Sequence, residues 1–211
     1  MYTRFAPAQL PETVPTAVLE RSPHPCFALT ESLNICYCNP AWDRFAGENG
    51  GGTNVLANSV MHKPLLQYVP RELRGNFESL FLKSRALGRP QAQDYECSSA
   101  QTFRLYRMQI YPLQPGSGFA VVNSLRVAHP HTRIAHEPDE AQYLHDDGLM
   151  RMCANCRRTR RLDDPAAWDW VPDFVEHPRK NVSHSVCPFC AEYYYGAYLS
   201  GKSEHRPAAA E

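Results

Sequence analysis

Short runs in which apolar and polar residues alternate fill much of the first 125 residues and predict strands. Cys26–Thr30 and Leu33–Cys38 flank the polar pair Glu31-Ser32, which predicts an antiparallel hairpin. Three further alternating runs follow a long helical segment, at 93–98, 102–111 and 118–125. The chain therefore contains five candidate strands in this region.

The run Thr102–Tyr111 changes its apolar phase partway along. Odd-numbered positions are apolar up to Leu105, and even-numbered positions are apolar from Tyr106 onward. Successive side chains of a strand point to opposite faces of a sheet, so this slip requires a bulge or a sharply twisted strand.

Helical signals separate the strands. Glu12–Arg21 predicts a short lead-in helix. Asn39-Pro40 predicts a helix start, because asparagine caps free amides and proline fits the first helical position. Arg71–Leu87 carries an apolar stripe at helical spacing and ends at Gly88-Arg89-Pro90. The predicted order is two strands, helices and three strands, which is an α+β arrangement.

The last third of the chain contains two Cys-x-x-Cys pairs, Cys153 with Cys156 and Cys187 with Cys190. A two-residue gap lets both sulfurs of a tight turn point into one tetrahedral site, and two such turns supply the four ligands of structural zinc. The apolar cluster 168–175 between the pairs is large enough to cover such a site. The pattern favours zinc; a redox-active or disulfide pairing and unrelated buried thiols are the alternatives.

Composition supports metal binding over structural disulfides. The sequence has no apolar run as long as a membrane span and no signal peptide at its start, so we expect a cytoplasmic location. In a reducing compartment a Cys-x-x-Cys pair indicates metal binding or catalysis before it indicates a disulfide. The 211 residues carry 22 basic and 22 acidic side chains, so the net charge does not call for a polyanionic partner.

Composition also divides the chain into segments. We predict a tail and lead-in helix over 1–22, a first domain over 23–126, a linker over 127–147, a four-cysteine module over 148–200 and a disordered tail over 201–211. The linker is rich in His, Pro and acidic residues and poor in apolar ones. Its histidines are expected to be solvated rather than metal ligands: His129, His131, His136 and His145.

The stretch Leu33–Trp42 is similar to the strand-then-Asn-Pro-Ala segment of PAS domains, and Tyr95–Leu113 resembles the last long hairpin of that family. The resemblance spans 27–125, about half of the chain. It implies a five-stranded antiparallel sheet with helices packed across one face, and a sensory role. Many PAS domains close with Asp-Ile-Thr, where this chain has Leu125-Arg126-Val127.

PAS domains hold ligands in the hollow between sheet and helices, so the resemblance implies a pocket whose ligand the sequence does not define. We expect its walls to include Phe45, His62, Phe77, Leu80, Met108 and Ile110. His62 is expected at the surface or the pocket edge rather than on a haem. Four other cysteines on predicted strands are expected to fill the core: Cys26, Cys36, Cys38 and Cys97.

The segments 148–158 and Ser183–Cys190, with Trp168 between them, resemble a C-terminal tail found on many bacterial PAS and response-regulator proteins. That tail carries Cys-x-x-Cys, a tryptophan and Ser-His-x-x-Cys-Pro-x-Cys in this order. The resemblance supports the pairing of the four cysteines. We expect His184 to hydrogen-bond a thiolate rather than to replace a ligand.

Together these features predict a non-enzymatic, bacterial-type sensory and signal-transduction protein with a zinc-stabilised interaction module. Sequence motifs of ATP-binding, phosphoacceptor and cyclase enzymes are absent. A protein partner or a second copy is expected to bind at Tyr193, Tyr194, Tyr195 and Tyr198. The basic run Arg157–Arg161 supports an alternative, a transcription-associated regulator that binds nucleic acid, although nearby aspartates offset its charge. A thiol-based redox sensor is the second alternative.

Overall fold

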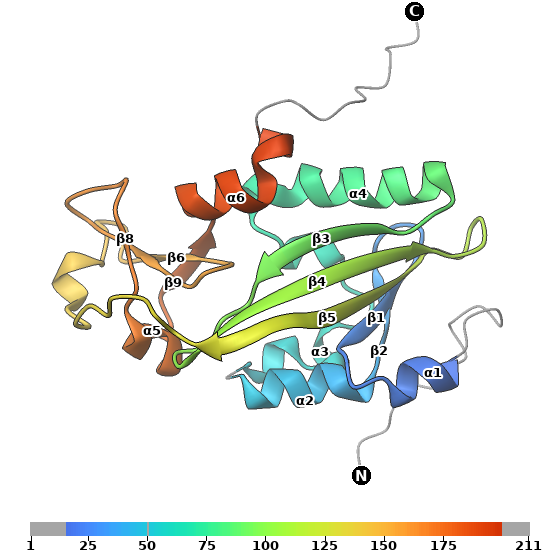
Figure 1. Cartoon of the computed structure of the whole chain (residues 1–211), viewed down its shortest axis with the longest axis horizontal. Helices are drawn as coiled ribbons and strands as arrows, with labels where there is room; N and C mark the ends of the chain where they lie inside the picture. The colour runs from blue at the N-terminus through green and yellow to red at the C-terminus, as the bar shows by residue number, and fades with distance from the viewer. Residues whose placement is uncertain (1–15, 50, 200–211) are drawn as a thin grey trace, which may run out of the picture.

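The computed structural model describes residues 16–49 and 51–199 (Figure 1). The tail predicted at 201–211 and the beginning of the predicted lead-in helix lie outside the described residues. The strands are β1 Cys26–Leu29, β2 Ile35–Cys38, β3 Gln91–Glu96, β4 Thr102–Pro112, β5 Phe119–Pro130, β6 Met150–Cys153, β7 Thr159–Arg160, β8 Trp168–Asp169 and β9 Val182–Ser185. The α-helices are α1 Thr16–Arg21, α2 Pro40–Glu48, α3 Ala57–Val60, α4 Arg74–Leu87, α5 Pro172–Glu176 and α6 Pro188–Leu199. Short 3-10 helices are η2 Thr53–Val55, η3 Leu65–Tyr68, η4 Arg71–Leu73 and η5 Glu140–Gln142.

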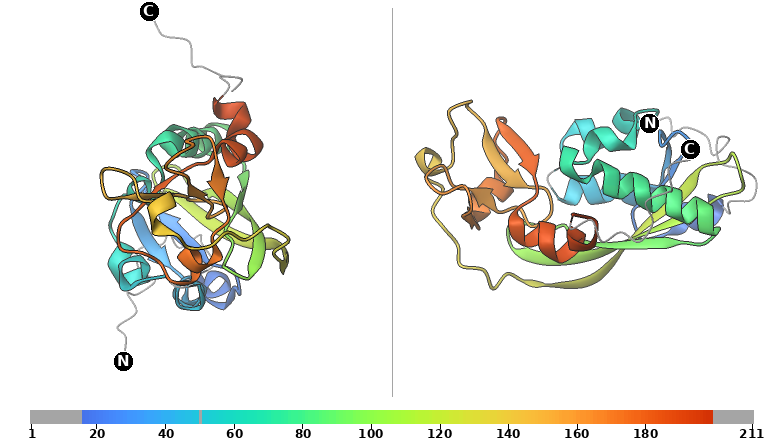
Figure 2. Two further views of the ribbon diagram at one scale, coloured as in Figure 1. Left: turned by 90° about the vertical axis from the view of Figure 1, so that its left-hand side faces the viewer. Right: turned by 90° about the horizontal axis from the view of Figure 1, so that it is seen from above.

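The N-terminal half, residues 16–130, is built on a five-stranded antiparallel sheet in the order β2-β1-β5-β4-β3. Helices α2, α3 and α4 lie over one face of this sheet (Figures 1 and 2). The predicted order of two strands, helices and three strands is confirmed. This half therefore has the five-stranded α+β arrangement that the PAS resemblance implies.

A register shift accompanies the phase slip predicted in the middle strand. Pairing of β4 with β5 shifts register between Leu105 and Tyr106, where Leu105 pairs with Val127 and Tyr106 with Leu125. Beyond the shift, Tyr106 and the alternate residues that follow it are buried. The extra residue is Arg126, so the bulge lies in β5, beside the point where the apolar phase of β4 changes.

Asn39 ties three segments together as well as capping α2. Its side-chain oxygen accepts hydrogen bonds from the amides of Trp42 (3.1 Å) and Cys26 (2.9 Å). Its Nδ2 donates to the carbonyl oxygens of Leu19 and His24, both at 2.9 Å. The predicted cap is confirmed, and burial of Asn39 at 1% exposure is possible because its hydrogen-bonding groups are engaged.

Strand β5 is longer than the alternation predicts. It continues through Pro130, which pairs with Thr102, and so crosses the boundary predicted at residue 126. Residues farther on are also part of the packed structure: Tyr143 is fully buried, and Ala135 forms a bridge with Trp170. The stretch predicted as a linker is therefore ordered by backbone pairing with β4 and by burial of the Tyr143 ring. Its polar average composition does not reveal either contact.

The C-terminal half, residues 131–199, contains a small four-stranded sheet in the order β8-β7-β6-β9. Strands β6 and β9 are parallel, with Met152 opposite His184 and Cys153 opposite Ser185. A separate core lies on this sheet and α5, formed by Tyr143, Met150, Met152, Val171 and Phe174. The parallel pairing brings the residues after Cys153 next to those after Ser185.

Helix α6 joins the two halves. It lies beside α4 and along β3, the edge strand of the large sheet (Figures 1 and 2). Tyr195 is buried against Val69 and Leu73. The Gln93 side chain donates to the Tyr194 carbonyl at 3.0 Å. The helix therefore covers an edge whose free backbone groups would otherwise face solvent.

Among the described residues, the helices are all too short or too polar to cross a bilayer.

Candidate metal centre

The four cysteines of the two Cys-x-x-Cys pairs meet in one buried cluster. The sulfurs of Cys153, Cys156, Cys187 and Cys190 lie within 4.8 Å of one another, and the residues are at most 1% exposed. All four are free thiols, and the sulfurs of Cys156 and Cys187 are 3.5 Å apart. We refer to these residues as the cysteine cluster.

Local structure places both pairs. Cys153 ends β6, and the chain turns back so that its amide donates to the Arg158 carbonyl at 2.8 Å. Arg157 adopts a left-handed backbone, φ 63°, within this turn. Pro188 begins α6, which places Cys190 in the first turn of that helix. The Ala154 amide donates to the Ser185 carbonyl at 2.8 Å and holds the two turns side by side.

Hydrogen-bond donors surround the sulfurs. The Cys187 amide donates to Cys153 Sγ at 3.4 Å, and the Cys190 amide donates to Cys187 Sγ at 3.5 Å. Arg158 Nη1 lies 3.9 Å from Cys156 Sγ. Such donors stabilise negative charge on sulfur, as a bound metal requires.

The protonation of the cluster also depends on a cation. Hydrogen bonds with the other three thiols, Cys156 first, lower the pKa of Cys153. Hydrogen bonds with the three other cluster thiols, that of Cys153 first, raise the pKa of Cys190. Four thiolates at this spacing would require a metal ion to offset their charge.

The donor set fits zinc. Tetrahedral zinc with sulfur ligands at about 2.3 Å places the sulfurs about 3.8 Å apart, close to the spacing found here. Trp168, Val186 and Tyr194 pack against the cluster and exclude water from it. A closed, four-sulfur site without an open position is typical of structural rather than catalytic zinc.

His184 does not make the thiolate contact expected of it. The residue is exposed, and its Nε2 lies 3.4 Å from Arg157 Nη1. The parallel register opposite Met152 points this side chain away from the cluster. Arg158 is the side chain that reaches a sulfur instead. Its position two residues after Cys156 is the sequence feature that could have predicted this contact.

Two of the four arginines in the basic run Arg157–Arg161 are engaged within the protein. Arg161 Nε pairs with Asp169 at 2.6 Å. The Arg158 guanidinium lies over the Phe189 ring, 5.7 Å from its centroid, as well as near the sulfur of Cys156. The neighbouring aspartates therefore offset part of the basic charge, as the sequence indicated.

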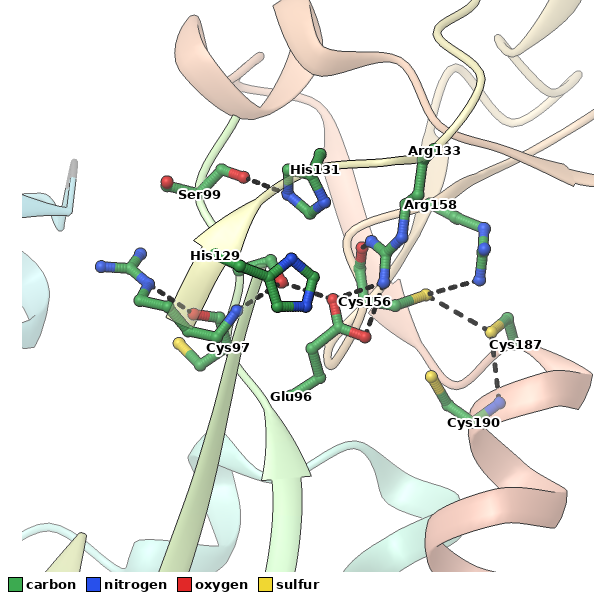
Figure 3. Close-up of polar contacts among 12 residues, drawn as sticks. Glu96, Cys97, Ser99, His129, His131, Arg133, Cys156, Arg158, Cys187 and Cys190 are labelled. Atoms are coloured by element: carbon green, nitrogen blue, oxygen red, sulfur yellow. Dashed lines mark hydrogen bonds and ion pairs between the residues drawn. The ribbon is translucent and has the colours of Figure 1, made fainter. Parts of the chain in front are cut away.

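Arg133 occupies the junction of the two halves, next to the cluster (Figure 3). Its Nη2 donates to both carboxylate oxygens of Glu96 at 2.7 Å, and its Nη1 donates to the Cys156 carbonyl at 2.8 Å. The guanidinium lies over Phe103 (5.8 Å) and Trp170 (5.1 Å). Sequence reasoning missed this residue, because a single arginine in a polar stretch carries no pattern.

The histidines predicted to be solvated differ from one another. His129 is exposed and stacks on Phe103 at 4.8 Å. His131 is half-buried against Trp170, with Nε2 2.9 Å from the Ser99 carbonyl oxygen, and burial lowers its pKa. His136 and His145 are also half-buried. Within the described ranges, no histidine joins a group of three or more potential metal ligands.

The residues expected to line a PAS-type pocket fall into three settings. Met108 and Ile110 are buried in the main core, with Phe77 and Leu80 packed against it. Phe45 contacts Tyr106 edge-on and borders a surface groove of about 270 Å³, together with Pro23, His24, Pro25, Ala41, Arg44, Glu48 and Leu125. His62 is exposed, with a left-handed backbone. The expected walls therefore do not all face one space.

The four remaining cysteines behave largely as core residues. Cys26 is buried, while Cys36, Cys38 and Cys97 are half-buried. Burial raises the pKa of Cys26 and of Cys36, which keeps these thiols neutral. This agrees with the expectation that they fill space rather than react.

The tyrosines of α6 do not form one exposed surface. Tyr195 is buried and its hydroxyl exchanges hydrogen bonds with the Asn155 amide at 3.1–3.2 Å. Tyr194 is half-buried against the cluster. Tyr193 is 71% exposed and stacks on Phe189, which is 56% exposed, with centroids 5.7 Å apart. Because α6 docks against η4 and α4, the exposed aromatic side chains of this helix are Phe189 and Tyr193, not the four tyrosines together.

No family model matches the sequence, and no curated protein matches it. Solved structures match about half of the chain. A domain of an HTR-like protein from Haloarcula marismortui is 17% identical over 50% of this chain and 100% of its own, with a TM-score of 0.37. The PAS domain of nitrogen regulation protein NR(II) from Vibrio parahaemolyticus is 16% identical over 54% and 97%, with a TM-score of 0.34. The PAS domain of BvgS from Bordetella pertussis is 16% identical over 52% and 79%, with a TM-score of 0.38. With TM-scores below 0.5, the fold of the N-terminal half rests on its own sheet order and helix arrangement.

Proposed function

We propose that this chain is a sensory, signal-transducing protein without enzymatic activity. Its PAS-like N-terminal half receives a ligand or a partner, and its C-terminal half is a zinc-stabilised interaction module. The observation that carries this proposal is the buried four-cysteine cluster, which Arg133 links to the end of β3, the edge strand of the large sheet. A closed site suits a structural metal, and its link to the sheet suits transmission rather than catalysis.

Zinc would be held by Cys153, Cys156, Cys187 and Cys190. The metal would offset the charge of four thiolates and cross-link β6 to the start of α6. A C-terminal half with a five-residue core of its own would gain much of its folding free energy from this cross-link. A reducing, cytoplasmic setting would keep these four cysteines available as metal ligands.

The output surface of the module would be the exposed pair Phe189 and Tyr193. Exposed aromatic side chains that lie together favour protein interfaces. A protein partner or a second copy of the chain is therefore preferred over nucleic acid, since Arg158 and Arg161 are engaged internally. The partner would be recognised next to the metal site.

Metal analysis and an ultraviolet–visible spectrum of anaerobically purified protein test the proposal. We expect one zinc per chain, no visible absorption, and thiols that become reactive only after chelation. An absorption spectrum typical of an iron–sulfur cluster or a haem would show that the cofactor is not zinc. A folded protein without stoichiometric metal, whose four cluster thiols titrate freely, would refute the zinc site and favour the thiol redox sensor.

A further inference from the structure

Arg133 makes contacts that join the cysteine cluster to the large sheet, and they carry a further inference. We infer that Arg133 couples metal binding at the cluster to the conformation of edge strand β3, so that each stabilises the other. The inference rests on the proposed metal site and goes beyond it, because it identifies the residue through which the two halves communicate.

Hydrogen bonds of Arg133 connect the end of β3 to the first Cys-x-x-Cys turn (Figure 3). Glu96 is the last residue of β3 and accepts two hydrogen bonds from Arg133 at 2.7 Å. The same guanidinium donates to the carbonyl of Cys156, which is a cluster residue, at 2.8 Å. One side chain therefore separates the end of β3 from the backbone of the first Cys-x-x-Cys turn.

Burial makes this path a single unit. The Glu96 side chain is 1% exposed and that of Arg133 is 14% exposed. Removing one partner of a buried ion pair leaves an uncompensated charge, which is strongly unfavourable. A displacement of the end of β3 must therefore carry Arg133 with it, and Arg133 must carry or release the Cys156 carbonyl.

Contacts with two aromatic rings restrict other positions for the Arg133 guanidinium. Phe103 belongs to β4 of the large sheet, whereas Trp170 belongs to the C-terminal half. Arginine presents several donors in a fixed plane, so it can bind a carboxylate and a carbonyl at once while its faces contact aromatic rings. The planar group is thus held in one orientation by both halves.

Coupling of this kind is reciprocal. If zinc fixes the Cys156 turn and thereby stabilises the Glu96 contact, the ordered β3 must increase zinc affinity by the same factor. Coupling between sites is typically about 5- to 150-fold, and residues that support metal ligands typically change affinity by about 10- to 100-fold. These ranges set the size of the effect to be measured.

Zinc affinity of the full-length chain, measured by competition with a chromophoric chelator, tests the inference. We expect Arg133→Gln to weaken zinc binding about 10-fold or more. Glu96→Gln should also weaken it, although Glu96 touches none of the four cysteines. The matched control is Arg179→Gln, because Arg179 also pairs with carboxylates, donates to a carbonyl and lies over an aromatic ring, but away from the cluster. The control should change zinc affinity less than about 2-fold.

Hydrogen exchange provides the reciprocal measurement. Zinc should slow amide exchange at Glu96, the end of β3, in the wild-type chain. Arg133→Gln should abolish that protection while leaving in place the effect of zinc on β6 and on the Gln93 segment, which contacts α6 instead. If Arg133→Gln does not fold, the double variant Glu96→Gln/Arg133→Gln removes both charges and is measured instead. Its expected result is the same loss of zinc-dependent protection.

The possible failures are distinguishable. Wild-type zinc affinity in Arg133→Gln or in the double variant, or zinc-dependent protection at Glu96 that survives either change, overturns the coupling and leaves the metal site intact. Failure of the wild-type chain to bind zinc overturns the proposed metal site and this inference together.

Discussion

Replacement of Tyr195 by alanine tests whether α6 is a structural bridge between the two halves. Tyr195 is 3% exposed, packs against Val69 and Leu73, and exchanges hydrogen bonds with Asn155, which is itself 5% exposed. Truncation removes the ring and leaves the Asn155 amide without this partner. Loss of a buried aromatic side chain typically costs about 3–5 kcal/mol.

Tyr193→Ala is the matched control, because Tyr193 lies two residues away on the same helix and is 71% exposed. Its replacement should change the free energy of unfolding by less than about 0.5 kcal/mol. An intermediate variant, Tyr195→Phe, keeps the ring and removes the hydroxyl. It should cost about 1–3 kcal/mol, because a buried amide loses a hydrogen-bond partner.

Urea unfolding of the zinc-saturated protein, followed by tryptophan fluorescence and by circular dichroism, measures these changes. With a urea slope of about 2 kcal/mol per molar, Tyr195→Ala should lower the midpoint by about 2 M. Similar midpoints for Tyr195→Ala and Tyr193→Ala would refute the reasoning, since they would mean that α6 does not pack on the N-terminal half in solution.

Three other predictions follow from the site and its surroundings. Cys190→Ser, or a strong chelator, should remove zinc and unfold the C-terminal half, which is visible as loss of protection in β6 but not in the core strand β4. Phe189→Ser/Tyr193→Ser should leave a folded, zinc-loaded protein whose self-association or partner binding is weaker in sedimentation; unchanged association would exclude this surface. The hydrogen bond from Arg107 lowers the pKa of Asp94, so this pair stabilises the fold above the unfolded pKa of about 3.9 and ceases to do so as pH falls through the lower folded value. Because both side chains are partly exposed, Arg107→Gln should destabilise the fold only slightly at pH 7, with the difference from wild type vanishing in strong acid.

Patterns within a few residues were enough to predict several features of this protein. The phase slip located the register shift at Leu105 and Tyr106. The Asn39-Pro40 pair identified a capped helix start. The Cys-x-x-Cys spacing selected the four residues whose sulfurs meet. Strand alternation, helix capping and tight-turn geometry are all set by neighbouring residues, so the sequence carries them directly.

The contacts between the two halves required the tertiary structure. Glu96 and Arg133 are separated by 37 positions, and Arg133 and Cys156 by 23, so no local period relates them. The tyrosines of α6 are alike in sequence, yet docking of the helix buries Tyr195 and exposes Tyr193. Likewise, β5 extends to Pro130 because β4 offers backbone partners there. Which side chains become buried, paired or exposed at this junction depends on how the two sheets and α6 pack together, and that packing is decided by contacts between distant segments.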